Sequence, residues 1–158
     1  MKKKVVYYPK KYYSGLTKKK IAERKKEIEK FGKMHWKDPR AYVGFKTDKG
    51  AKTRRSSYTA EWNRLFPDAK SLEEKSEVTG VPLKYIKHVA AKAKAAWRSG
   101  HRPGAVQNQW VHPRVASYLL CGKAHYTADA ADVRRAKKES ASARKWFKRC
   151  KTSKLTKV

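Results

Sequence analysis

Positive charge is the property that most limits how this chain can fold. Its 42 Lys and Arg residues face only 13 Asp and Glu residues, which gives a formal net charge of +29 at pH 7. Charge of one sign repels itself in a compact chain, so such a protein is stabilised by a polyanionic or acidic partner. Hydrophobic residues make up 39% of the chain, below the roughly 45–50% of an average globular domain. We therefore expect a modest core and large solvated or partner-bound surfaces.

Length, cysteine content and hydropathy narrow the class of protein further. A chain of 158 residues corresponds to one domain. Cys121 and Cys150 are too few for the disulfide framework of a small secreted protein. No apolar region follows the basic cluster Lys2–Lys4, so it is not a signal peptide. No window approaches the roughly 18 apolar residues of a membrane span. We expect a soluble protein that is not secreted and has no transmembrane segment.

The chain divides by pattern into four segments. Residues 1–31 form a basic and aromatic N-terminal arm with a surface helix, and residues 32–56 form a loop-rich linker. Residues 57–122 carry the sustained three- and four-residue apolar spacing of a helical core domain. Residues 123–158 form a basic C-terminal helix and tail. The expected fold class is mainly α: a small helical domain with a helix-turn-helix-like unit and extended basic N- and C-terminal arms.

Within these segments the pattern also predicts boundaries and burial. Turn residues predict a loop over residues 33–56, either without regular structure or with a small hairpin that turns at Asp48–Gly50. Pro113 separates two short helical pieces, and one last helix runs from about Asp129 to Phe147. Four large side chains fall on apolar stripes and should be mostly buried: Trp62, Ile86, Trp97 and Trp110.

The strongest local motif is a helix-turn-helix-like unit over residues 72–89. Gly80 permits the turn, Ser76 is small enough to let two helices approach, and the apolar Ile86 and Val89 would fix the second helix to the core. The exposed face of that helix would carry Lys84, Lys87 and His88, which suits contact with phosphates or a groove. The alternative is an ordinary corner between two helices, since the face lacks the Gln, Asn and Arg residues that read bases.

The N-terminal arm alternates basic and aromatic residues. Tyr7, Tyr8, Tyr12 and Tyr13 are candidate anchors on a neighbouring protein, because aromatic side chains bury a large area at low entropic cost. The alternative is a short strand or a disordered tail. The following helix has only a thin apolar stripe, so we expect it to lie on a surface or a partner.

A second tract, Trp97–Trp110, places a basic turn between two tryptophans. Arg98, His101 and Arg102 could converge at a helix end to hold an anion; alternatively, the tryptophans are core residues and the turn simply links helices. In the linker, Arg54 and Arg55 are further candidates for contact with nucleic acid or another anion.

Motifs of catalysis and cofactor binding are missing from the sequence. It has no phosphate-binding loop, nucleophile elbow or dinucleotide fingerprint. Asp129 and Asp132 look like first-turn helix residues favoured by the helix dipole. Cys121 and His125 have no second pair with which to hold zinc. We expect no enzyme activity, no catalytic residue, no metal and no cofactor.

Several stretches together resemble a known family. They are DPRAYVGFKTDKGAKTRRSSYTAEW, TGVPLKYIKHV, AAWRSGHRPGAVQNQW and RVASYLLCGKAHYTAD. The chain resembles small, basic, uncharacterised proteins of large DNA viruses, of the algal giant-virus type, and of some phages. The resemblance covers about residues 38–132. It departs where Val111–Pro113 replaces a glycine and an aromatic residue, and in the Lys- and Ala-rich helix before Trp97. It implies a viral setting and no reaction.

Two functional classes remain open. The leading hypothesis is a structural component of a large DNA virus particle, of the minor-capsid or core-wall type, whose basic surface and arms bind capsid proteins, anionic membrane or packaged DNA. The alternative is a non-specific DNA-binding or packaging protein that uses the helix-turn-helix-like unit. We expect the protein in the virion, in its interior or on the inner capsid surface, after synthesis in the host cell, and we expect no small-molecule substrate. Both hypotheses predict salt-dependent association, so charge alone does not separate them.

Overall fold

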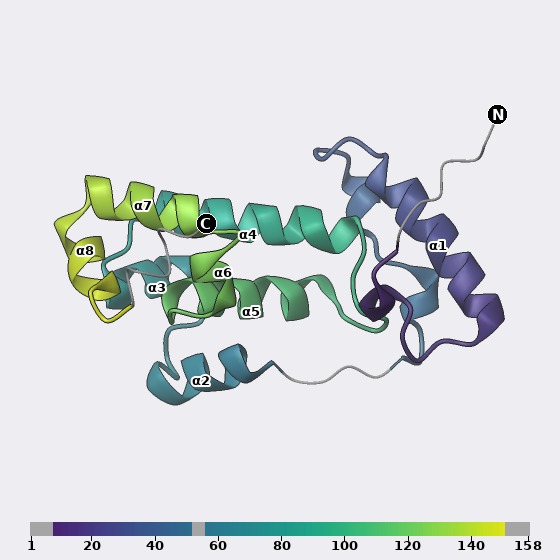
Figure 1. Cartoon of the computed structure of the whole chain (residues 1–158), viewed down its shortest axis with the longest axis horizontal. Helices are drawn as coiled ribbons and strands as arrows, with labels where there is room; N and C mark the ends of the chain where they lie inside the picture. Colours follow the sequence, from purple (N-terminus) through teal and green to yellow (C-terminus); the bar gives the residue numbers. More distant parts are fainter. Residues whose placement is uncertain (1–7, 52–55, 151–158) are drawn as a thin grey trace. The chain divides into compact units, whose positions relative to one another are not determined.

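The protein is built from helices, as the sequence predicts (Figure 1). The computed structural model describes residues 8–51 and 56–150, and no strand occurs in this part of the chain. The chain divides into two compact units. Of the described residues, 8–51 and 94–110 form unit 1, and 56–93 and 111–150 form unit 2. The segment 57–122, expected to form one helical core, therefore contributes to both units. The outermost parts of the expected basic arms, residues 1–7 and 151–158, lie outside the described residues.

Unit 1 is organised around one long helix. Its elements are η1 (Lys10–Tyr12), α1 (Lys18–Gly32), η2 (Pro39–Tyr42) and η3 (Lys46–Asp48). The Thr17 side chain caps α1 by accepting a hydrogen bond from the Lys20 backbone N–H at 3.4 Å. Ile28 and Phe31 face inward, and the Phe31 ring stacks on Phe45 with 5.1 Å between centroids.

A turn does form at Lys49 and Gly50, but among the described residues no strands flank it, so the hairpin suggested there is wrong; the 3₁₀ helix η3 precedes the turn. The Glu27 carboxylate accepts hydrogen bonds from the backbone N–H groups of Lys46 at 2.6 Å and Thr47 at 3.2 Å. These bonds satisfy the backbone at the start of η3, in place of a partner strand.

Unit 2 is a bundle of short helices around parts of two longer ones. Its elements are α2 (Ser57–Leu65), α3 (Leu72–Thr79), α6 (Lys123–Tyr126), α7 (Ala130–Glu139) and α8 (Ala141–Phe147), together with the unit 2 parts of α4 (Leu83–Arg98) and α5 (Gln107–Leu119). Its core contains fully buried apolar side chains from α4, α5, α7 and α8: Ile86, Val89, Val115, Leu119, Val133 and Phe147.

The predicted burial is confirmed for three of the four large side chains. Trp62, Ile86 and Trp97 are buried, and the indole N–H of Trp62 donates to the Ala69 carbonyl at 2.8 Å. The indole N–H of Trp97 donates to the Ala105 carbonyl at 2.8 Å. Trp110 is only half-buried.

Two helix boundaries differ from the prediction. Pro113 lies inside α5 instead of separating two helices, because buried side chains on both sides of it, such as Val111 and Val115, hold one continuous helix against the core. The single last helix is instead two helices that meet at Ser140. Its backbone is extended there (φ −125°, ψ 125°), and its side chain caps α8 by accepting from the Ala143 N–H at 3.2 Å.

A disulfide joins Cys121 to Cys150, with 5.4 Å between the Cα atoms. Two cysteines separated by 29 residues carry no spacing signal, so this pair was not predicted from the sequence. The bond ties the end of α5 to the segment after α8 and so closes unit 2 around α6, α7 and α8.

Candidate functional site

The helix-turn-helix-like unit forms as a local structure. Gly80 has a left-handed backbone (φ 74°), and the Ser76 hydroxyl donates to the Val81 carbonyl at 2.7 Å across the turn. A Cβ atom added at Gly80 would lie 2.7 Å from the Ser142 side chain of α8. The turn therefore needs glycine both for its backbone angle and for its close approach to α8.

The outward face of α4 carries the predicted contact residues, but acidic groups of α7 occupy part of this face. The Lys84 ammonium lies 2.5 Å from the Glu139 carboxylate, which also accepts a hydrogen bond from the Tyr85 hydroxyl. The His88 ring lies 2.7 Å from the Asp132 carboxylate. The exposed Lys87 has no ion pair in the described part of the chain. A groove-reading helix needs a free face, and here α7 runs beside it (Figure 1).

Asp129 and Asp132 form buried ion pairs that were not predicted from the sequence. Both carboxylates are buried, and Lys92 of α4 lies 2.6 Å from Asp129 and 2.7 Å from Asp132. Arg114 of α5 donates two hydrogen bonds to Asp129, at 2.7 and 2.9 Å. Asp132 does lie in the first turn of α7, but both buried carboxylates are also neutralised within unit 2 by the half-buried cations Lys92 and Arg114.

The three basic candidates near the end of α4 do not meet around one anion site. Arg98 donates from one nitrogen to the Phe31 and Met34 carbonyls, each at 3.0 Å, and so completes the end of α1. His101 is fully buried between the Trp97 carbonyl at 2.7 Å and the Asp48 carboxylate at 2.8 Å. Arg102 is exposed. Bonds within unit 1 thus occupy Arg98 and His101.

Arg24 is the central polar residue of unit 1, and the sequence analysis did not single it out. Its fully buried guanidinium donates to the backbone carbonyls of Tyr12 and His101, to the Thr47 hydroxyl at 2.9 Å and to the Asp48 carboxylate at 2.8 Å. Burial raises the pKa of Asp48, but hydrogen bonds from His101 and Arg24 outweigh this effect, so the pKa lies below its usual value.

Three tyrosines of the N-terminal arm, Tyr8, Tyr12 and Tyr13, pack on their own chain. Tyr8 and Tyr12 lie against the Ile28, Phe31 and Phe45 cluster. The Lys25 ammonium lies 5.5 Å from the centre of the Tyr8 ring and 5.3 Å from that of Tyr13. These interactions fix the described part of the arm to α1. The remaining candidates Tyr7, Arg54 and Arg55 lie outside the described residues.

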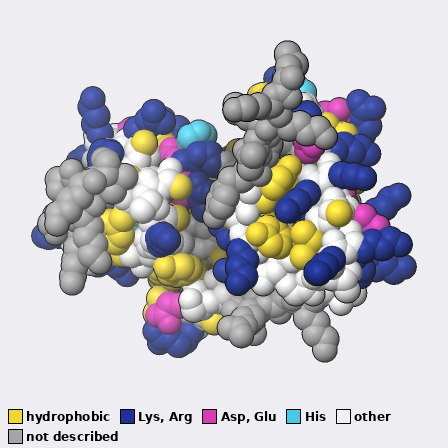
Figure 2. All heavy atoms as spheres, turned by 45° about the vertical axis from the view of Figure 1, so that its right-hand side comes forward, with side chains coloured by type: hydrophobic (Ala, Val, Ile, Leu, Met, Phe, Trp, Pro, Cys, Tyr) yellow, Lys and Arg dark blue, Asp and Glu magenta, His cyan; other side chains and the backbone are white. Residues whose placement is uncertain are grey.

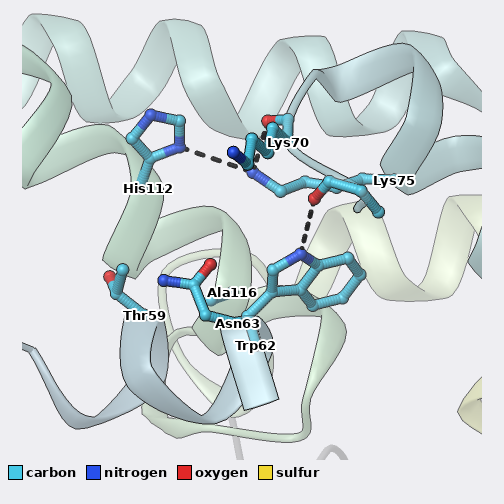
Figure 3. A pocket seen from close by; sticks show the side chains of 8 residues that line it. Thr59, Trp62, Asn63, Lys70, Lys75, His112 and Ala116 are labelled. Carbon is cyan, nitrogen blue, oxygen red and sulfur yellow. Dashed lines mark hydrogen bonds between the residues drawn. The ribbon is translucent and has the colours of Figure 1, made fainter. Parts of the chain in front are cut away.

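A cavity of about 270 Å³ opens in unit 2 between α2, α3 and α5 (Figure 3). Lys75 extends over Trp62 toward His112, and its ammonium donates to the Lys70 carbonyl at 3.1 Å and lies 3.4 Å from the His112 Nδ1 atom. Trp62, Ala69 and Ala116 supply apolar walls, and the polar lining comes from Thr59, Asn63, Lys70, Lys75 and His112. The cavity brings together residues that the sequence analysis did not connect.

The helices α7 and α8 carry a dense basic surface. Seven of their side chains and those just after α8 are exposed Lys or Arg: Arg134, Arg135, Lys138, Arg144, Lys145, Lys148 and Arg149. Between residues 133 and 150 the only carboxylate is Glu139, which pairs with Lys84. On the face drawn in Figure 2, Lys and Arg side chains likewise far outnumber Asp and Glu side chains.

The described residues contain neither a metal-binding cluster nor a membrane-spanning helix. No group of three or more His, Cys, Asp or Glu side chains there could hold a metal ion. None of the helices in that part of the chain combines the length and the apolar character that crossing a membrane requires.

Comparison with known proteins identifies the family of the chain. Residues 9–152 match the Family of unknown function (DUF5824). No curated protein and no solved structure matches the chain.

Proposed function

We propose that this protein is a non-enzymatic structural protein that binds nucleic acid through charge. The premise is that the chain belongs to the Family of unknown function (DUF5824) and so inherits no activity. Its main binding site would be the α7–α8 basic surface, defined by the exposed Lys and Arg residues between 134 and 149. The resemblance to proteins of large DNA viruses makes packaged DNA in a virus particle the natural polyanion.

The observation that supports this proposal is the distribution of acidic groups. The carboxylates nearest the α7–α8 basic surface are already neutralised inside unit 2: Asp129 by Lys92 and Arg114, Asp132 by Lys92, and Glu139 by Lys84. The exposed side chains of Arg135, Lys138, Lys145 and Lys148 can then displace the counterions of a phosphate backbone, and this release drives non-specific binding.

The α7–α8 basic surface is also held firmly enough to present these charges. The Arg144 guanidinium donates to the Lys137 carbonyl at 2.7 Å, which completes the end of α7. Arg149 stacks on Trp146 with 3.7 Å between the guanidinium carbon and the ring centre. Such interactions reduce the side-chain entropy that ordering on a partner would cost.

Sequence-specific reading of a groove fits the geometry less well. Lys84 and His88 on α4 are engaged by Glu139 and Asp132. Base discrimination in the major groove also depends on bidentate hydrogen bonds from Arg, Asn or Gln, which this face does not offer. We therefore infer that binding is indifferent to sequence.

Binding to other particle proteins is a second candidate function, favoured by apolar exposure in unit 1. Trp36 is 59% exposed and Val43 is 73% exposed on either side of η2, and the Tyr42 hydroxyl donates to the Trp36 carbonyl at 2.6 Å. Exposed aromatic residues are enriched at protein interfaces. Substituting Trp36 and Val43 by Ser should reduce incorporation into particles while DNA affinity stays unchanged.

The test of the main proposal compares two variants of equal charge. One replaces Arg135, Lys138, Lys145 and Lys148 by Gln; the control replaces four exposed lysines of α1, Lys18, Lys19, Lys20 and Lys26, by Gln. Affinity for an arbitrary DNA duplex is measured by fluorescence anisotropy at one salt concentration. We expect the α7–α8 variant to lose about tenfold or more in affinity and the control to lose less. Equal losses would show that net charge alone governs binding.

A further inference from the structure

We propose that the cavity between α2, α3 and α5 binds a small organic oxyanion, a carboxylate or phosphomonoester, with its charged group on Lys75 and its apolar part against Trp62. This inference is independent of the nucleic-acid proposal, because the cavity lies wholly within unit 2 and uses none of the α7–α8 residues.

Lys75 is buried at the cavity. The residue is only 3% exposed, although lysine is almost never fully buried unless it is paired. Its ammonium contacts the Lys70 carbonyl and His112 and forms no ion pair with a carboxylate in the described part of the chain. The exposed Glu74 carboxylate attracts it at longer range, but burial outweighs this attraction and lowers the pKa of Lys75. An ammonium buried without a close counter-charge is costly, and an anion placed beside it would offset that cost.

The other polar groups that line the cavity are basic or neutral. His112 lies 3.4 Å from the Lys75 ammonium, and burial, followed by the charge of Lys75, lowers the pKa of this ring. The remaining polar groups at the cavity include the exposed side chains of Asn63 and Lys70. Among the described residues no Asp or Glu lines the cavity. The lining therefore contains two lysines and further hydrogen-bond donors but no acidic group, which favours an anion over a cation.

The size of the cavity and its apolar wall limit which molecules could bind there. The Lys75 ammonium lies over the Trp62 ring, 5.8 Å from the centre of that ring. Trp62, Ala69 and Ala116 are all buried. A cavity of about 270 Å³ is slightly below the roughly 300–1,000 Å³ of drug-sized sites. It suits a small molecule with one charged group and one compact apolar group.

Binding to the wild-type protein tests the proposal without any mutation. Phenyl phosphate, benzoate and uncharged phenol are titrated by calorimetry, with inorganic phosphate as the anion that lacks an apolar part. We expect phenyl phosphate or benzoate to bind at least about tenfold more tightly than phenol and than inorganic phosphate, since a charge-assisted hydrogen bond and apolar burial each contribute. Equal binding of phenol and the two aromatic anions, or no binding of any probe at millimolar concentration, would overturn the proposal.

A variant then locates the site. Lys75→Met keeps the length of the side chain and removes the charge, so we expect it to fold and to lose about tenfold or more in affinity for the aromatic anions. The matched control Lys87→Met removes an exposed lysine of α4 and should bind like the wild type. Unchanged binding by a folded Lys75→Met protein would place the anion elsewhere and refute the assignment.

One further comparison separates the two sources of a phosphomonoester. Oligonucleotides with and without a 5′-phosphate are compared as competitors of phenyl phosphate. Competition that depends on the 5′-phosphate would identify a nucleic-acid end as the source. Competition by neither oligonucleotide, with phenyl phosphate still bound, would identify a free small molecule. Either of these two results is consistent with the oxyanion site. Equal displacement of phenyl phosphate by the oligonucleotides with and without the 5′-phosphate would contradict the requirement for a terminal oxyanion.

Discussion

Replacing Arg24 by Met should destabilise the protein by about 4 kcal/mol. The change removes the donors of four hydrogen bonds and leaves the Tyr12 and His101 carbonyls and the Thr47 hydroxyl without this partner. Asp48 keeps its bonds to His101 at 2.8 Å and to the Gly104 N–H at 2.9 Å, so its charge stays partly compensated. Removing one member of a buried ion pair costs about 3–5 kcal/mol. The three acceptors left without this donor add a cost of their own, which places the expected loss of stability within that range.

Urea unfolding followed by tryptophan fluorescence measures this loss, because Trp97 stacks on His101 with 4.6 Å between ring centres. The exposed Lys26 on the same helix provides a control: Lys26→Met should change the free energy of unfolding by less than about 0.5 kcal/mol. Arg24→Lys keeps the charge but not the branched donor geometry, so it should recover only part of the loss. If Arg24→Met lowered the free energy of unfolding by less than about 1 kcal/mol, the claim that Arg24 organises unit 1 would be refuted.

Three further predictions concern unit 2. Thr59→Val should raise the free energy of unfolding by about 1 kcal/mol in urea titrations, because the Thr59 hydroxyl oxygen is buried without a partner among the described residues; a loss of stability would contradict this. Replacing Cys121 and Cys150 by Ser should lower the free energy of unfolding of the oxidised protein by about 3–4 kcal/mol, as expected for opening a loop between residues 29 apart, and an unchanged urea midpoint would show that no disulfide forms. Burial lowers the pKa of His125 below its usual 6.5, so the unfolded chain takes up this proton first, and stability should fall as the pH drops from about 6.5 through the folded pKa. A His125→Gln variant should show a shallower pH dependence of its urea midpoint, and an identical dependence would exclude His125 as the source.

The helices of residues 57–98 were predictable because local signals agree there. Ser71 caps α3, the left-handed Gly80 ends it, and Pro82 lies just before α4, where a proline costs no helical hydrogen bond. Ile86 and Trp97 then follow the helical period and are buried. Each boundary depends on residues close in sequence.

The buried polar residues were harder to predict, although two of them carried a signal. Arg24 lies on the same helical stripe as Ile28 and Phe31, and Lys75 lies three residues after Leu72 and four before the buried Thr79. A charged residue on an inward stripe predicts a buried ion or hydrogen-bond network. The partners of these residues come from distant segments, and their identity depends on tertiary packing that periodicity does not encode.

The pairs of His101 with Asp48 and of Cys121 with Cys150 had no such signal. Asp48 and His101 lie in a 3₁₀ helix and a loop, 53 residues apart, where no period applies. Likewise, nothing in the sequence shows that Glu139 and Asp132 would cover the candidate groove-reading face of α4. The basic character of the protein was therefore predictable from composition, while the choice of its available basic surface required the fold.

The most direct test of electrostatic binding through the α7–α8 basic surface is the salt dependence of DNA affinity. The logarithm of the association constant is plotted against the logarithm of salt concentration for the wild type and for the variant with Arg135, Lys138, Lys145 and Lys148 replaced by Gln, on two unrelated duplexes. The proposal predicts a steep negative slope that is the same for both duplexes and becomes shallower by about 0.9 for each phosphate that the variant no longer neutralises. A slope unchanged by the four substitutions, or a large preference for one duplex that persists at high salt, would contradict it.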